Sequence, residues 1–306
     1  MTEKIPLILK NVLEKINPTK KELEMIKCII DDFRKNVGKK IKELKIKADI
    51  FIGGSFAKKT MIKKDIYDID VFIRFDKKHA NISELTGKIL GNFKKREVKG
   101  SRNYFILDFI HFFIEVIPVL KISNPRNAEN VTDLSYSHVS YIKRKIKNPR
   151  ILDEIKLAKA FCHANECYGA ESYVRGFSGY AIELLVYHYK GFVNFLKAFE
   201  KMKIKEVIDI EKHFKNKNEV FMDLNESKLH SPVILVDPTF KNRNALAALS
   251  DETFEKFKKV CSEFLKNPSE KFFEPRISNL KKIKFQAERK KFDFVEIRAK
   301  TDRQEG

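Results

Sequence analysis

Tryptophan is absent from this chain of 306 residues, and cysteine is scarce. The four cysteines, Cys28, Cys162, Cys167 and Cys261, are too scattered along the sequence to form a disulfide framework. Only Cys162, His163 and Cys167 approach the spacing of metal ligands, and a zinc site would need a fourth ligand and usually a CxxC pair. We therefore expect buried or idle thiols and predict no structural metal.

A long apolar run is also missing. No stretch is apolar over the roughly 18 residues that a membrane-spanning helix requires. The first fifteen residues carry an acid and lysines early and lack a signal-peptide core, and no internal repeat is visible. These absences argue against a membrane protein and predict a cytoplasmic location.

Positive charge dominates what is present. Lysine and arginine together number 62 against 42 acidic residues, which gives a formal net charge of +20. A surplus of this size favours polyanions through counterion release, and nucleic acid is the commonest polyanion in a cytoplasm. A lysine-rich composition is also a proteome-wide habit of some heat-loving cells, so the charge alone leaves both explanations open.

The most informative segment lies between residues 51 and 75, where an apolar stretch is followed by Gly53, Gly54 and Ser55, a basic loop, and then Asp68 and Asp70. Alternate side chains point to opposite faces of a strand, so the two carboxylates share one face. Glycines let backbone N–H groups approach a phosphate. The ordered combination favours a nucleotide site over the alternative, a tight turn followed by an edge strand with two solvated aspartates.

Two adjacent carboxylates call for a cation, and Mg²⁺ prefers hard oxygen ligands completed by substrate phosphates and water. A two-metal transferase needs a third acid. The strand FIEVIPV supplies Glu115, a single acid in an apolar strand, which is costly to bury unless it is paired or bound to metal. By itself, Glu115 facing solvent at an edge would be an equal alternative; beside Asp68 and Asp70, the metal site is favoured.

The periodicity of the sequence predicts an α+β chain. A capping box at Thr19 and Glu22 opens a long helix, which we expect to pack behind a sheet. Strands are expected at 49–52, 69–75, 104–109 and 112–120, the last two as a hairpin. After a polar connector at 125–130 the periodicity becomes helical, with helices at 153–164, 179–198 and about 246–264, and a loop at 236–244.

Several motifs together resemble one known family. They are GGSFAKKT followed by DID, the strand IEVIPV, and the stretches YGAESYVRGFSGYAIELLVYHY, VDPTFKNRNALAALS and NPSEKFFEP. In this combination the chain resembles the archaeal-type, class I CCA-adding tRNA nucleotidyltransferases, from its first helix to about Pro275. The RGFSGY and DP-RN-A-A-L stretches separate this family from poly(A) polymerases and oligoadenylate synthetases.

The resemblance implies a DNA polymerase β-like catalytic head, a helical neck, and body and tail domains that grip tRNA. We accordingly expect a head over residues 1–145, a neck over 146–257 and a partial, basic body segment over 258–306. The family continues beyond the point where this sequence stops at Gly306, so we expect a chain shortened at its C-terminus.

The resemblance also implies site residues. Asp68, Asp70 and Glu115 match the metal-binding carboxylates for two Mg²⁺ ions, although the family usually has Asp at the third position. The residues implied to contact the nucleotide are Gly54, Ser55 and Lys58 in the turn, Ser135 and His138 in DLSYSH, Lys159 and Tyr168 for triphosphate and ribose, and Arg243 for the base edge of ATP or CTP. Taken singly, Lys159, Tyr168 and His138 would be ordinary surface or half-buried residues.

The expected function is therefore template-independent transfer of CMP and AMP from CTP and ATP to the 3′ end of tRNA. Two alternatives stay open. One is another nucleotidyltransferase on the same head, either a terminal transferase acting on short RNA or an oligonucleotide synthase. The other is one part of a split enzyme, in which a second polypeptide supplies the body and tail domains for tRNA binding.

Overall fold

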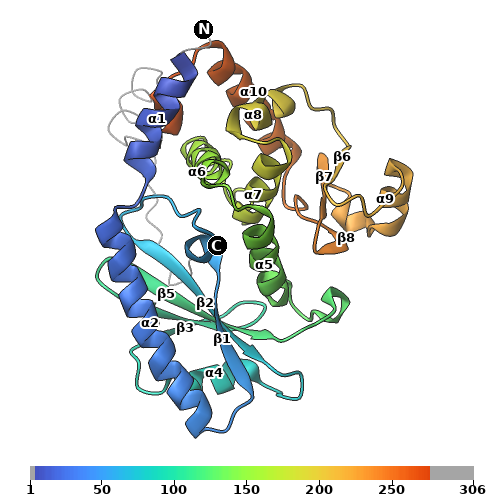
Figure 1. Ribbon diagram of the computed structural model, residues 1–306. Helices are drawn as coiled ribbons and strands as arrows, with labels where there is room; N and C mark the ends of the chain where they lie inside the picture. The colour runs from blue at the N-terminus through green and yellow to red at the C-terminus, as the bar shows by residue number, and fades with distance from the viewer. Residues whose placement is uncertain (1–3, 276–306) are drawn as a thin grey trace, which may run out of the picture.

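A five-stranded mixed sheet forms the core of the N-terminal half in the computed structural model, which describes residues 4–275 (Figure 1). The strands are β1 (Ala48–Ile52), β2 (Tyr67–Phe75), β3 (Arg96–Val98), β4 (Tyr104–Asp108) and β5 (Phe112–Leu120). Their order in the sheet is β1-β2-β5-β4-β3; β2 and β5 are parallel, and the other pairs are antiparallel. This confirms the expected α+β class and the β4–β5 hairpin, whereas β3 was not predicted.

Helices α2 (Lys20–Glu43) and α4 (Ile82–Leu90) cover one face of this sheet (Figure 1). The capping box at the start of α2 is present, because the Thr19 side chain accepts from the Glu22 N–H and Glu22 accepts from the Thr19 N–H. Apolar residues of α2 at helical spacing pack on buried strand residues such as Ile69 and Val71. The opposite face is left for the polar residues of β2 and β5.

A second core joins the helices of the C-terminal half. It contains α1 (Lys4–Ile16), α6 (Pro149–Ala164), α7 (Gly179–His188), α8 (Phe192–Glu200), α10 (Asp251–Lys266) and the short turn η4 (Glu270–Phe273). At its centre the Phe161 ring contacts Phe257 and Phe264 edge-on, and all three are fully buried. The expected domain division stays a prediction; α1 packs with the C-terminal half, and α10 runs without a break across residues 257 and 258.

The expected helix over 179–198 is wrong, because the chain forms two helices with a break between them. Lys190 and Gly191 both adopt positive φ, 58° and 139°, which ends α7. The carboxylate of Glu154 on α6 then accepts the Phe192 N–H at 2.8 Å and starts α8 in a new direction. Likewise, the helix expected from about 246 begins only at Asp251, capped by the Ser250 hydroxyl.

The loop expected at 236–244 is also wrong. Strands β7 (Val233–Asp237) and β8 (Phe240–Asn244) form an antiparallel hairpin there, and β6 (Glu206–Asp209) pairs with β7 in parallel. The polar composition of β8 hid the strand, since its first four residues are only half-buried. The remaining short elements are α5 (Ser135–Lys145), α9 (Lys217–Asp223), η1 (Pro125–Asn127), η2 (Val131–Leu134) and η3 (Glu226–Lys228).

Two further observations concern the cysteines and the apolar content of the helices. All four cysteines are free, and all but Cys28 are buried. Between residues 4 and 275, no helix combines the length and the apolar content that crossing a membrane would require.

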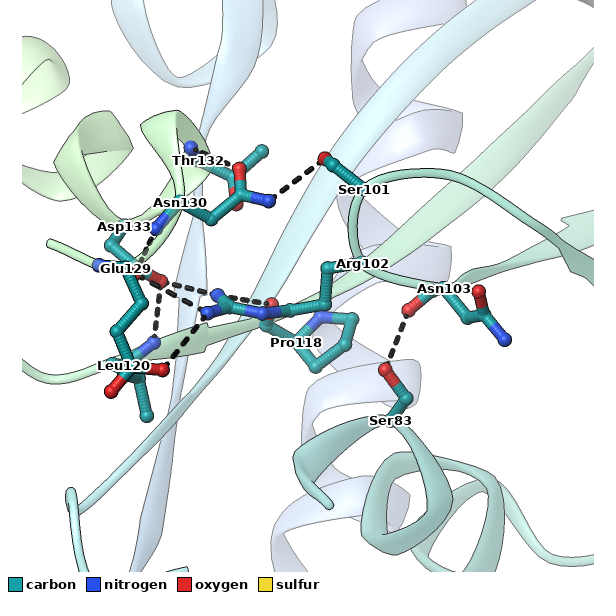
Figure 2. A network of polar contacts seen from close by, with 10 residues as sticks. All are labelled: Ser83, Ser101, Arg102, Asn103, Pro118, Leu120, Glu129, Asn130, Thr132 and Asp133. Carbon is teal, nitrogen blue, oxygen red and sulfur yellow. Dashed lines mark hydrogen bonds and ion pairs between the residues drawn. The ribbon is translucent and has the colours of Figure 1, made fainter. Parts of the chain in front are cut away.

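A buried carboxylate fixes the start of α5 against the end of β5 (Figure 2). Asp133 accepts hydrogen bonds from the N–H groups of Leu120 at 2.8 Å, Asn130 at 3.0 Å and Glu129 at 3.1 Å. Arg102 approaches it from the loop before β4 and completes an ion pair. Because α5 begins two residues later, this network sets where the side chains of α5 lie.

Asp133→Asn is expected to lower the free energy of unfolding by about 3 kcal/mol, because it leaves the mostly buried Arg102 guanidinium with only the exposed Glu129 carboxylate, 3.9 Å away, as an anionic partner. Urea denaturation measures this loss. Asp108→Asn is the matched control, since Asp108 pairs with Arg96 on the exposed surface, where such a pair contributes about 0–1 kcal/mol. Equal stabilities of the two variants would contradict the role given to the network.

Candidate functional site

Three carboxylates lie on the face of the sheet that α2 leaves open. Strands β2 and β5 are parallel and in register, with Asp70 opposite Glu115 and Asp68 opposite Phe113. Residues paired in register point to the same side of a sheet. Asp68, Asp70 and Glu115 therefore share one face, while Ile69 and the other intervening residues are buried on the opposite face.

The backbone of Gly54 lies directly against Asp70. Gly54 has φ +59°, and a Cβ atom there would come within 1.7 Å of the Asp70 carboxylate oxygen, so only glycine fits. Burial, reinforced by the neighbouring Asp68 charge, raises the pKa of Asp70 to about 6. The cations Lys58 and Lys64 oppose this shift, and Lys64 Nζ lies 2.8 Å from Asp68 Oδ1.

These residues fit a divalent cation that is completed by its substrate. Within residues 4–275, no three His, Cys, Asp or Glu side chains gather closely enough to form a metal centre by themselves. Mg²⁺ usually takes only one or two carboxylates and fills its other positions with phosphate oxygens and water. Asp68 and Asp70 supply such a pair, and a cation beside them would relieve the cost of ionising Asp70.

A pocket of about 150 Å³ lies in front of these carboxylates, between the two halves of the molecule. Helix α3 (Gly54–Lys58) and the loop after it form one wall, and α6 and the start of α7 form the other. Of the residues predicted from the sequence, Gly54, Ser55, Lys58, Asp68, Asp70, Lys159 and Tyr168 line it. Three larger grooves, of about 470, 690 and 780 Å³, contain none of the predicted residues.

Sequence reasoning missed the residue that connects the two walls. Glu183 on α7 is fully buried, and its two carboxylate oxygens lie 2.7 Å from Lys58 Nζ and 2.8 Å from Lys159 Nζ. The Thr60 hydroxyl donates to the second oxygen at 2.8 Å. Burial alone would raise the pKa of Glu183, but the Lys159 and Lys58 ammonium groups lower it to about 2. Its signal in the sequence was a lone acid in the apolar helix GYAIELLVYH.

A second polar cluster gathers two more predicted residues around Asp237, which was also missed. Asp237 Oδ2 lies 2.9 Å from His138 Nε2 and 2.8 Å from Arg243 Nη1. Its other oxygen accepts from Tyr180 and Thr239. Burial lowers the pKa of His138, with Asp237 opposing the shift; Asp237 itself, buried beside His138 and Arg243, has its pKa held well below the ordinary value.

Helix α7 connects the pocket with this second cluster. Tyr180 stacks on the His138 ring at 4.0 Å, and Glu183 lies three residues further along the same helix face. Ser135 lies one turn before His138 on α5. His138, Arg243, Ser135 and Glu115 do not line the pocket itself. The structure thus places seven predicted residues at the pocket and His138 and Arg243 in the polar cluster around Asp237, whereas Ser135 and Glu115 belong to neither group.

Tyr168 and His163 close the far side of the pocket. Their rings stack at 3.8 Å, and both line the cavity. A Cβ atom at Gly179 would come within 2.7 Å of the Tyr168 hydroxyl oxygen, so glycine at the start of α7 lets the Tyr168 side chain keep its position. Burial lowers the pKa of His163 to about 4 and raises that of Tyr168. Both side chains are therefore uncharged at neutral pH.

Two family models match successive parts of this chain. Residues 4–146 match the model described as Second Messenger Oligonucleotide or Dinucleotide Synthetase domain. Residues 153–274 match the model described as tRNA nucleotidyltransferase, second domain. The first covers the sheet with its carboxylates, and the second covers the helices that form the opposite wall.

The curated archaeal relatives include two proteins that each carry the name CCA-adding enzyme. The one from Nanoarchaeum equitans is 44% identical over 67% of this chain and 52% of the relative's length. The one from Methanocaldococcus jannaschii is 31% identical over 90% of this chain and 63% of its own length. The chain thus spans about half to just under two thirds of the length of these relatives.

Solved structures with the same fold include the Cid1 poly(U) polymerase bound to MgATP, with a TM-score of 0.69 and 14% identity over 90% of this chain and the whole of the other. A cytoplasmic RNA terminal U-transferase matches with a TM-score of 0.66 and 13% identity, over 89% of this chain and 99% of that one. At this level of identity the likeness establishes the fold alone.

Asp70→Asn is expected to raise the stability of the metal-free protein at pH 8. The folded-state pKa of Asp70, about 6, exceeds the ordinary value of 3.8. The ionised carboxylate therefore destabilises the fold, and this cost grows as the pH rises from about 4 to about 6. Replacing the carboxylate with an amide should raise the free energy of unfolding at pH 8 by at most about 3 kcal/mol, because one pKa unit corresponds to about 1.4 kcal/mol.

Urea unfolding in the presence of a chelator, at pH 4 and at pH 8, tests this expectation. The gain of Asp70→Asn over the wild type should be larger at pH 8, and Asp108→Asn, at an exposed position, should give no such difference. A gain that is the same at both pH values would show that ionised Asp70 carries no such cost.

Proposed function

We propose that this chain, which is similar to the archaeal CCA-adding enzymes over most of its length, transfers CMP and AMP from CTP and ATP to the 3′ end of tRNA without a template. One observation carries the proposal. Asp68 and Asp70 lie beside the backbone of Gly54 in a pocket whose other wall presents Lys159. Paired carboxylates facing ammonium groups and an open backbone suit a metal-bound triphosphate.

Asp68 and Asp70 in the pocket would hold Mg²⁺, and Glu115, on the same sheet face but outside the pocket lining, would join them as the third ligand only when the substrate completes the site. Two such ions, when bound, would activate the tRNA 3′-hydroxyl and neutralise the departing pyrophosphate. Lys58 and Lys159 compensate the charge of the triphosphate from opposite walls. The Ser55 hydroxyl and the backbone of the Gly-Gly-Ser turn supply hydrogen bonds to it. These residues position the α-phosphate and stabilise the charge that develops during transfer.

The polar cluster around Asp237 is proposed to select the base. Arg243 is held at Nη1 by Asp237, and its guanidinium fork can still donate to an acceptor pattern that cytosine and adenine share. His138 and Ser135 on α5 contact the nucleotide in this arrangement, and Tyr168 packs near the ribose. The net charge of +20 supports a tRNA partner, and a cytoplasmic location accords with that partner.

A second candidate function rests on the match of residues 4–146 to the oligonucleotide synthetase model. In that case the same pocket would join nucleotides to one another or to a short RNA. Such an enzyme would form product from nucleoside triphosphates alone. A split enzyme would instead need a partner polypeptide before it acted on tRNA.

Incubation with tRNA that lacks CCA, labelled CTP or ATP, and Mg²⁺ distinguishes these functions. The proposal predicts ordered addition of C, C and A to the tRNA and no product when tRNA is omitted. Product without tRNA would identify the second candidate. Absence of ordered addition would reject CCA transfer by this chain alone.

Asp68→Ala and Asp70→Ala are each expected to reduce nucleotide incorporation by at least about 100-fold, because each removes a carboxylate proposed to hold metal. Circular dichroism and thermal melting should show an intact fold. Asp108→Ala is the matched control, since it removes an exposed aspartate at the end of β4 and should leave incorporation unchanged. Retained activity in either pocket variant would refute its assigned role.

A further inference from the structure

Glu183 contacts cations from both walls of the pocket, Lys58 from one and Lys159 from the other. We propose that Glu183 is a positioning residue, which sets the separation and orientation of Lys58 and Lys159 so that both ammonium groups can bind one triphosphate. This inference rests on the proposed nucleotide site, and it adds a residue that neither the sequence motifs nor the carboxylate pair had indicated.

The geometry gives Glu183 an indirect role. Both lysines line the pocket, whereas Glu183 does not. The exposed fraction of the side chain is 0% for Glu183, 4% for Lys159 and 9% for Lys58. Glu183 is thus shielded from any ligand and acts through its two neighbours.

The hydrogen-bonding capacity of the lysines leaves donors for an anion. An ammonium group has three N–H donors. Lys159 gives one to Glu183 and one to the Thr60 hydroxyl, and Lys58 gives one to the other oxygen of Glu183. Each lysine therefore retains at least one further donor. Two ammonium groups against one carboxylate also leave a surplus positive charge at the pocket wall.

The same contacts join the two halves of the molecule. Lys58 and Thr60 belong to the sheet-bearing half, while Lys159 and Glu183 lie on α6 and α7. One carboxylate with an oxygen for each lysine holds the two ammonium groups within hydrogen-bond distance of a single side chain. A triphosphate, which carries several anionic oxygens, can then contact both cations without a rearrangement of the walls.

A simpler electrostatic view predicts the opposite effect. If Glu183 only competed with phosphate for the lysines, its neutralisation would strengthen nucleotide binding, because a negative charge would leave the site. Glu183, however, accepts from both ammonium groups, one at each carboxylate oxygen, whereas an amide in its place offers only one oxygen acceptor and would release one of the two lysines. Positioning therefore predicts weaker binding in Glu183→Gln, and competition predicts tighter binding.

Calorimetric titration of the full chain with ATP and Mg²⁺, and separately with inorganic tripolyphosphate, decides between these outcomes. Glu183→Gln should raise the dissociation constant for both ligands at least tenfold. Glu183→Asp keeps the negative charge but has a shorter side chain, so its dissociation constants should lie between those of Glu183→Gln and those of the wild type. Where activity is measurable, KM for ATP should rise more than kcat falls.

Glu211→Gln is the matched control, because Glu211 also accepts from a hydroxyl, that of Tyr141, and from a lysine, Lys145, but away from the pocket. It should leave ATP affinity unchanged. Unchanged or tighter ATP binding in Glu183→Gln would overturn the proposal; a lower melting temperature with wild-type affinity would leave only a structural role. Because these titrations need no tRNA, failure of CCA addition would be recognised separately.

Discussion

The parallel pairing of β2 with β5 is the constraint on which the rest of the site depends. It places Asp70 opposite Glu115 and leaves Asp68 on the same face. The register is fixed because the alternate residues, among them Ile69 and Ile114, are fully buried against helices on the other face. A shift of one residue would expose those apolar side chains and bury the carboxylates. The cost of packing therefore specifies the position of the acids.

The second requirement is that two separate cores meet at one pocket. Helix α7 contributes to both parts of the site. Its Glu183 pairs with the lysines of both walls, and its Tyr180 donates a hydrogen bond to the buried Asp237. Each carboxylate is buried and paired with cations, so breaking either pair is costly. The proposed phosphate site and the proposed base-selecting cluster thus share one helix as a support.

Local signals explain what the sequence predicted well. The capping box at Thr19, the alternation along β2 and the β4–β5 hairpin depend on neighbouring residues, and the structure confirms them. The β7–β8 hairpin and the break at Lys190 depend on tertiary contacts, and both were missed. Glu183 was missed because its partners Lys58 and Lys159 lie 125 and 24 residues away. Asp237 was missed because the segment that holds it and Arg243 was expected to be a loop, and its contact with His138 spans 99 residues. Lys159 and Arg243 were found only through resemblance to a family.

The most direct test of the central claim is the position of the metal. A crystal of the full chain with Mn²⁺ and a non-hydrolysable CTP analogue would locate the ion by anomalous scattering. The account predicts an anomalous peak coordinated by Asp68 and Asp70, on the side of Glu115, with the triphosphate between Lys58 and Lys159. A triphosphate bound elsewhere, or an ion that these carboxylates do not contact, would contradict it.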